Sequence, residues 1–186
     1  MPRKLKITEM ERLTAEEFRV ADKTALVLVL DNVRSLNNVG SLFRTADALR
    51  LEKICLCGIT GRPPHPELHK TALGAEEVVE WAYYTDTIDA VTELKKEGAF
   101  VLALEQAEGS VDIRKLSALS LSGKPHVALV AGNEVDGVAQ AVIDLCDATI
   151  EIPQKGTKHS LNVSVAGGIA LWELYKQLDH NPQHRQ

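Results

Sequence analysis

An α/β fold, with a mostly parallel sheet and helices on both faces, is predicted from two observations on the 186-residue sequence. Short apolar, β-branched runs recur along the chain with helical stretches between them, which is typical of repeated strand–helix–strand units. The runs are continuously apolar rather than alternating, and such strands are buried on both faces, as in a parallel sheet covered by helices on each side. The length fits one domain with a sizeable core.

The elements follow from these patterns in chain order. Strands are predicted at residues 24–30, 53–59, 77–84, 99–105, 126–132 and 148–153. Helices are predicted at residues 39–49, 87–97, 138–145 and 161–178, where apolar residues recur with helical spacing. A further helix is predicted near Thr14, because the sequence TAEE has the spacing of a capping box.

We expect a basic, partly helical extension over residues 1–24, a single domain over 25–178 and a frayed tail over 179–186. No apolar stretch is long enough to span a bilayer, and the basic N-terminus is not followed by a hydrophobic signal core, so we expect a cytoplasmic protein without a membrane partner. Cys55 and Cys57 alternate on a predicted strand, which places both on one buried face and outside any disulfide.

The formal net charge of −5 argues against a broad surface that coats nucleic acid, but it leaves room for local basic patches. Three basic clusters are Arg3, Lys4 and Lys6; Arg62, His65, His69 and Lys70; and Lys155, Lys158 and His159. Each cluster alone is typical of a solvated surface. His65 and His69 have the spacing of metal ligands on a helix, but Pro63, Pro64 and Pro66 should break that helix, so no metal site is expected.

The first motif, NNVGSLFRTADAL, follows the first predicted strand. Asn38 is predicted to cap a helix that begins at Val39. The helix then carries an apolar stripe formed by Val39, Leu42, Ala46 and Leu49. Arg44 lies off this stripe and is expected to face solvent. It is either an ordinary surface arginine or a residue that binds phosphate with a planar, bidentate contact that lysine cannot reproduce.

The second motif, ALVAGNEVDGV, ends a predicted strand at Gly132 and places Glu134 in the turn that follows. Ligands of α/β proteins bind at the carboxyl ends of parallel strands, so this turn is a candidate binding loop. The alternative is a plain turn in which Asn133, Asp136 and Gly137 satisfy the turn geometry.

The third motif, IEIPQKGTKHSLNVSVAGG, consists of a strand, a loop and a helix that Ser160 is predicted to cap. Ser160 and Asn162 lie at the donor-rich end of that helix, which favours an anionic or electron-rich ligand group. A simple capping serine is the alternative, but it does not explain Gly167 and Gly168. Each interior glycine costs a helix about 1 kcal/mol, so another backbone is expected to come close there.

Together, the three motifs resemble the SpoU (TrmH) branch of the SPOUT superfamily, the knotted RNA ribose 2′-O-methyltransferases. The resemblance extends from about residue 25 to residue 178. Its residues are Asn38, Gly40 and Arg44; Gly132, Asn133 and Glu134; and Ile152, Pro153, Ser160, Leu161, Asn162 and Val163.

The resemblance implies a homodimer whose C-terminal part forms a deep trefoil knot, a rare exception to unknotted topology. It also implies that S-adenosylmethionine binds among the loops that form the knot. The glycine pair would then permit close packing within the knot or across the dimer interface. The cofactor-binding residues implied are Leu104, Glu105, Ala131, Gly132, Asn133, Ile152, Ser160 and Leu161.

The resemblance further implies methyl transfer to a ribose 2′-hydroxyl of tRNA or rRNA. Arg44 would engage the RNA phosphate and help to remove the hydroxyl proton, while Asn38 and Glu134 fix the orientation of Arg44. Ser160 and Asn162 would shape the cofactor and ribose sites. Because an arginine has a very high pKa, the orienting role is the firmer of the two roles of Arg44.

Two other functions compete with this interpretation. The first is a non-catalytic, knotted module for RNA binding or assembly. The second is a different nucleotide-binding α/β enzyme, which would need phosphate-binding glycines after the first strand, and the sequence DNVRSLNNVG does not supply them. We expect no appended RNA-binding domain, so RNA recognition should come from the core, the N-terminal segment and the partner subunit.

Overall fold

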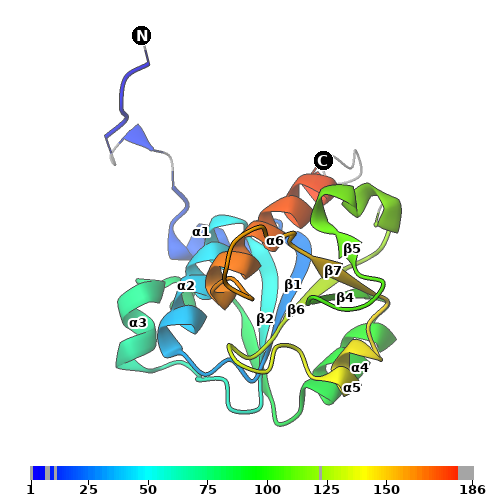
Figure 1. Cartoon of the computed structure of the whole chain (residues 1–186). Helices are drawn as coiled ribbons and strands as arrows, with labels where there is room; N and C mark the ends of the chain where they lie inside the picture. Colours follow the sequence, from blue (N-terminus) through cyan, green and yellow to red (C-terminus); the bar gives the residue numbers. More distant parts are fainter. Residues whose placement is uncertain (1, 7–8, 11, 122, 180–186) are drawn as a thin grey trace.

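The computed structural model describes residues 2–6, 9–10, 12–121 and 123–179. A seven-stranded sheet in the order β3-β2-β1-β6-β4-β7-β5 forms its centre (Figure 1). Every strand pairing is parallel, so the predicted parallel sheet is confirmed. The strands are β1 (Thr24–Asp31), β2 (Leu51–Cys57), β3 (Trp81–Tyr84), β4 (Phe100–Leu104), β5 (Val111–Asp112), β6 (Val127–Ala131) and β7 (Ala148–Glu151).

Helices cover both faces of the sheet, also as predicted (Figure 1). They are α1 (Ala15–Val20), α2 (Leu36–Ala48), α3 (Pro66–Ala72), α4 (Thr87–Lys96), α5 (Gln140–Ile143) and α6 (Val163–Asp179), with 3₁₀ helices η2 (Ala75–Glu77) and η3 (Ile113–Leu119). Strand β1 shows why its sequence is continuously apolar. Leu28 enters the core shared with α2 and α6, whereas its neighbour Val29 enters the core shared with α4 and α5.

The beginning of α2 differs from the prediction. The helix begins at Leu36 rather than Val39, and Ser35 caps it by accepting a hydrogen bond from the Asn38 backbone N–H at 3.3 Å. Asn38 therefore lies inside the first turn, where its side chain is directed to other partners. Arg44 faces solvent, as the predicted stripe requires.

Pro63, Pro64 and Pro66 were predicted to break a helix that would carry both His65 and His69; a short helix, α3, does form here, but His65 lies outside it. Pro66 is the first residue of α3, a position at which its missing N–H is not needed, and the His65 side chain caps the helix by accepting the Glu67 N–H. The prolines thus fix where α3 begins rather than excluding it.

Other elements begin or end at different residues from those predicted. The predicted strand over 77–84 is a strand only from Trp81, because the 3₁₀ helix η2 extends to Glu77. The predicted helix over 138–145 is reduced to the short α5, and the two-residue β5 and η3 were not predicted. The capping box before α1 is confirmed, with Thr14 and Glu17 bonded reciprocally. Residues 180–186 of the predicted frayed tail lie outside the described residues.

The two cysteines on β2 lie where the alternation places them. Cys55 and Cys57 are both free and fully buried in the core that faces α4 and α5. Burial is the main cause that raises the pKa of each thiol to about 12. Both thiols are therefore protonated, hydrophobic core groups.

Candidate active site

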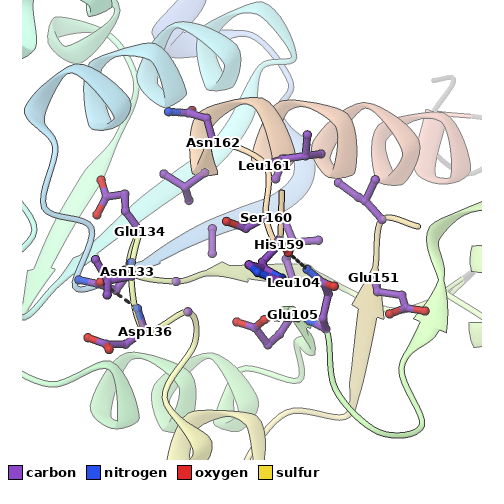
Figure 2. A pocket seen from close by; sticks show the side chains of 18 of the residues that line it. Leu104, Glu105, Asn133, Glu134, Asp136, Glu151, His159, Ser160, Leu161 and Asn162 are labelled. Atoms are coloured by element: carbon purple, nitrogen blue, oxygen red, sulfur yellow. Dashed lines mark hydrogen bonds between the residues drawn. The ribbon is translucent and has the colours of Figure 1, made fainter. Parts of the chain in front are cut away.

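The carboxyl ends of β4, β6 and β7 open into a pocket of about 460 Å³ (Figure 2). Every residue predicted to hold a cofactor lines this pocket: Leu104, Glu105, Ala131, Gly132, Asn133, Ile152, Ser160 and Leu161. Asp136, Gly137, Glu151, Val163 and Ala166 also line it and were not predicted. The volume is within the range typical of small-molecule sites, about 300–1,000 Å³.

The loop after β6 forms one wall of the pocket and closes on itself. Asn133 and Gly137 exchange two backbone hydrogen bonds of 3.0 Å, and the Asn133 side chain accepts the Val135 N–H at 2.8 Å. A Cβ atom on Gly132 would lie 2.2 Å from the Gly137 carbonyl carbon. Only glycine fits at position 132, because the two arms of the loop are in backbone contact.

Two carboxylates brace this loop from outside. Glu105 accepts the Val138 N–H at 2.9 Å, and the buried Asp31 accepts the Ala139 N–H at 3.0 Å. Asp31 also accepts the Thr87 hydroxyl at 2.6 Å, which ties the loop to the first turn of α4. The role of Asp31 was missed, although an acid that ends a continuously apolar strand was a signal for it.

Glu134 joins the second motif to the first. Its carboxylate accepts the backbone N–H groups of Arg34 and Ser35, each at 2.9 Å, and the Asn38 side-chain amide at 2.9 Å. Partial burial alone would raise the pKa of Glu134, but these hydrogen bonds outweigh it and the net effect is a lowered pKa. Glu134 is therefore ionised at neutral pH.

Asn38 joins the first motif to the third. Its side-chain oxygen accepts the Asn162 amide at 3.0 Å, while its amide nitrogen donates to Glu134. A continuous hydrogen-bonded chain therefore links Glu134, Asn38 and Asn162. The three residues are separated by up to 124 positions in the sequence, yet they come together at the edge of the pocket.

Asn162, not Ser160, caps α6, so the predicted cap was wrong. The Asn162 side-chain oxygen accepts the Ser164 N–H at 2.9 Å and the Val165 N–H at 3.3 Å. Ser160 lies two residues earlier, exposed on the pocket wall, in a segment that Gln106 holds by donating to the His159 carbonyl at 2.7 Å.

The glycines of α6 have different surroundings. A Cβ atom on Gly167 would lie 2.8 Å from a methyl group of Leu42, so Gly167 permits close packing of α6 on α2. A Cβ atom on Gly168 would meet nothing within 4 Å. The expected close approach is therefore found within the chain at Gly167 only, and the approaching atoms belong to a side chain.

Arg44 lies in a second cavity, of about 730 Å³, between α2, α3 and α6. Its neighbours there include Lys70, Thr71 and Trp172. No hydrogen bond or ion pair joins Arg44 to another residue in the described part of the chain. In particular, no hydrogen bond joins Arg44 to Asn38 or Glu134 in the described residues, and those two side chains bond to each other.

His65 uses its Nδ1 to accept the Glu67 N–H at the start of α3. His69 lies with Glu76 and Glu77 in a group whose potential ligand atoms are all within 4.8 Å of one another. The carboxylate of Glu76 is bonded to His69 at 2.5 Å and to the Gly74 N–H at 3.0 Å. These two contacts account for the burial of Glu76 without an ion.

The fold is an α/β fold with a pocket at the carboxyl edge of a parallel sheet, the edge at which α/β proteins bind ligands. The sequence pattern of the SpoU rRNA Methylase family matches residues 25–172, and the chain belongs to this family. Within the described residues, no helix is both long and apolar enough to cross a membrane.

Comparisons with individual proteins and solved structures agree with this family assignment. The chain is 35% identical over 87% of its length to a protein from Vibrio parahaemolyticus, the 23S rRNA (guanosine-2'-O-)-methyltransferase RlmB, and it spans 63% of that relative. A TrmH/SpoU tRNA modifying enzyme from A. aeolicus superposes with a TM-score of 0.76 at 28% identity, covering 89% of this chain and 81% of that enzyme. An AdoMet-bound rRNA methyltransferase from Sinorhizobium meliloti gives a TM-score of 0.76 at 32% identity, covering 87% and 60%.

Proposed function

We propose that the protein transfers a methyl group from S-adenosylmethionine to a ribose 2′-hydroxyl of tRNA or rRNA. One observation carries the proposal: the chain Glu134–Asn38–Asn162 unites all three motifs beside one pocket. Family membership and the activities named for the relatives support it. No observation on the described residues specifically favours the alternative, a non-catalytic RNA-binding module.

The pocket suits the cofactor by size and by the groups that line it. Residues at the carboxyl ends of β4, β6 and β7 would hold it, together with Ser160 and Leu161 in the segment before α6. The bound cofactor supplies a sulfonium methyl group that is already activated for transfer. The protein therefore has to supply alignment and a path for the hydroxyl proton. A relative of this chain, the Sinorhizobium meliloti rRNA methyltransferase, has a structure with AdoMet bound.

The Glu134–Asn38–Asn162 chain gives the site its rigidity. It fixes the loop after β6 against the first turns of α2 and α6, so the pocket walls keep their spacing when RNA binds. Positioning of this kind supplies a large part of the rate when the reacting groups need only to be aligned.

Arg44 is proposed to bind the RNA phosphate and to assist removal of the hydroxyl proton. Its neighbour Lys70 lines the same cavity, so two cations are close together on a surface formed by α2 and α3. Lys70 is also paired with Glu67, which leaves Arg44 as the cation best placed for a planar phosphate contact.

We also propose a homodimer. An exposed apolar stripe of Leu161, Val165, Ile169 and Trp172 begins at the pocket and ends at the cavity of Arg44. A second subunit that covered this stripe would bury Trp172, which is 51% exposed, and would join the two cavities into one site. The open space around Gly168, on the same helix, would admit such a close approach.

Three further points belong to the proposal. The C-terminal part of the domain over residues 25–178 is inferred to form the trefoil knot of the SPOUT fold, with residues 1–24 as an extension and 179–186 as a tail. The protein is inferred to act in the cytoplasm. No resident metal ion is required by the proposed chemistry.

The test is incubation of the purified protein with isotope-labelled S-adenosylmethionine and separated tRNA and rRNA, followed by mapping of the labelled nucleotide. Arg44→Lys should retain cofactor affinity but lower transfer by roughly two orders of magnitude or more, because positioning or proton transfer is lost. Arg50→Lys, at another exposed arginine, is the matched control. Retention of RNA without any transfer would favour the non-catalytic module instead.

A further inference from the structure

The pocket has an unbalanced charge. Four carboxylates line it, those of Glu105, Glu134, Asp136 and Glu151 (Figure 2). Among the described residues that line the pocket, His159 is the only one whose side chain can become positive. The acidic side chains therefore set the sign of the field inside.

The partners of these carboxylates are neutral. Glu134 accepts only backbone and amide N–H groups, and Glu105 accepts the backbone N–H groups of Gln106 and Val138. No ion pair in the described part of the chain includes any of the four. Neutral donors stabilise a carboxylate without cancelling its charge, so the pocket stays negative when it is empty of ligand.

Basic residues do occur close by in the sequence but do not line the pocket. Arg34 precedes α2, and Lys155 and Lys158 lie in the loop after β7. All three are exposed and none of them lines the pocket, so solvent and salt lie between their charges and the pocket interior. They therefore compensate the pocket carboxylates only in part.

The two forms of the cofactor differ in charge. S-adenosylmethionine carries a sulfonium, an α-ammonium and an α-carboxylate group, which leaves one net positive charge. During transfer the methyl–sulfur bond breaks with its electron pair left on sulfur, a bond forms to the ribose oxygen, and the hydroxyl proton passes to solvent. The product, S-adenosylhomocysteine, is a thioether with no net charge. The pair thus differs by one methyl group and one positive charge.

We propose that the pocket carboxylates, Asp136 and Glu105 in particular, bias the site toward the cationic methyl donor and against its neutral product. This inference rests on the proposed function, since it concerns the same pocket. The consequence is that the attraction between pocket and cofactor weakens at the moment of transfer. The charge lost by the cofactor then promotes its exchange for a fresh donor.

The two acids play different parts. Asp136 is exposed at the pocket wall and its carboxylate forms no hydrogen bond with another described residue, so its charge can be removed without loss of a structural contact. Glu105 is half-buried and braces the loop through Val138. Asp136→Asn is therefore the cleaner variant, and Glu105→Gln tests the more deeply placed charge.

The experiment measures the dissociation constants of S-adenosylmethionine, S-adenosylhomocysteine and sinefungin by calorimetry, on the full chain and its variants. Sinefungin carries an amine in the position of the sulfonium group and so reports on charge without methyl transfer. In Asp136→Asn and in Glu105→Gln, the preference for the two cationic ligands over the neutral product should fall by roughly three- to tenfold. Raised salt should reduce the preference in the wild type as well.

Glu108→Gln is the matched control, because Glu108 is an exposed acid near β4 that does not line the pocket. It removes the same charge from the protein and should leave the preference unchanged. An unchanged preference in Asp136→Asn, with the variant folded, overturns the inference, and so does an equal change in Glu108→Gln. Failure of the wild type to bind any of the three ligands overturns the proposed function instead.

Discussion

Glu134→Gln is the substitution that tests the linkage of the three motifs most directly. The carboxylate accepts three hydrogen bonds, from the N–H groups of Arg34 and Ser35 and from the amide of Asn38. Glutamine keeps one acceptor oxygen but presents an NH₂ group where the second oxygen received a donor. At least one donor is then left without its acceptor, and the charge that strengthens the others is gone.

The expected loss is about 1–2 kcal/mol in the free energy of unfolding at pH 7, at or below the lower end of the range for hydrogen bonds to a charged group, because the backbone N–H of the exposed Arg34 can bond to water instead. For a protein of this length the corresponding fall in Tm is about 2 to 8 °C. Urea denaturation followed by circular dichroism gives the free energy, and a calorimetric scan gives Tm. Cofactor affinity should fall as well, since Glu134 lines the pocket.

The same substitution has a defined pH dependence. Hydrogen bonding lowers the pKa of Glu134 in the folded state, so its contribution to stability is present above the pKa of the unfolded chain, about 4.3 for glutamate. The contribution is lost as the pH falls through the lower, folded-state pKa. The difference in stability between wild type and Glu134→Gln should therefore be constant from pH 7 to about pH 5 and should narrow below pH 4.3.

Glu108→Gln controls for the loss of one negative charge, because no hydrogen bond joins the Glu108 side chain to another described residue. It should change stability by less than about 0.5 kcal/mol. The reasoning about Glu134 is refuted if Glu134→Gln behaves like this control. It is also refuted if the deficit of Glu134→Gln is the same at pH 3.5 as at pH 7.

Two other predictions concern packing. Gly132→Ala should destabilise the fold by about 3 kcal/mol or more and abolish cofactor binding in a thermal-shift assay, because the added Cβ would overlap backbone atoms. Gly156→Ala, in an open loop, should have little effect on stability or on cofactor binding. Equal effects of the two substitutions would contradict the loop geometry. Cys55 and Cys57, which are fully buried and whose pKa burial raises to about 12, should react with iodoacetamide at pH 8 only after denaturation. Rapid labelling of the native protein, measured by mass spectrometry, would disprove their burial.

The parallel sheet could be predicted from the sequence because its evidence is local. Continuous apolar runs require burial on both faces, and Leu28 and Val29 confirm this by entering opposite cores. The cofactor-binding candidates were implied by the family resemblance rather than by a local pattern, and all of them line the pocket. Most of them lie at or just after the carboxyl ends of β4, β6 and β7, which meet at one edge of the parallel sheet.

The tertiary structure alone decided the roles of the polar side chains. Asn38 and Ser160 each had the local chemistry of a helix cap, but Ser35 and Asn162 took those positions. Asn38 instead bonds to Glu134 and Asn162, which lie 96 and 124 residues further along the chain.

The surroundings of Arg44 also could not be predicted from the local sequence. The helical pattern correctly predicted that it faces solvent, but not that it would lie in a separate cavity beside Trp172, away from Glu134. A hydrogen-bonding side chain takes whichever partner the fold brings within about 3 Å, and that partner is set by chain segments that the local sequence does not contain.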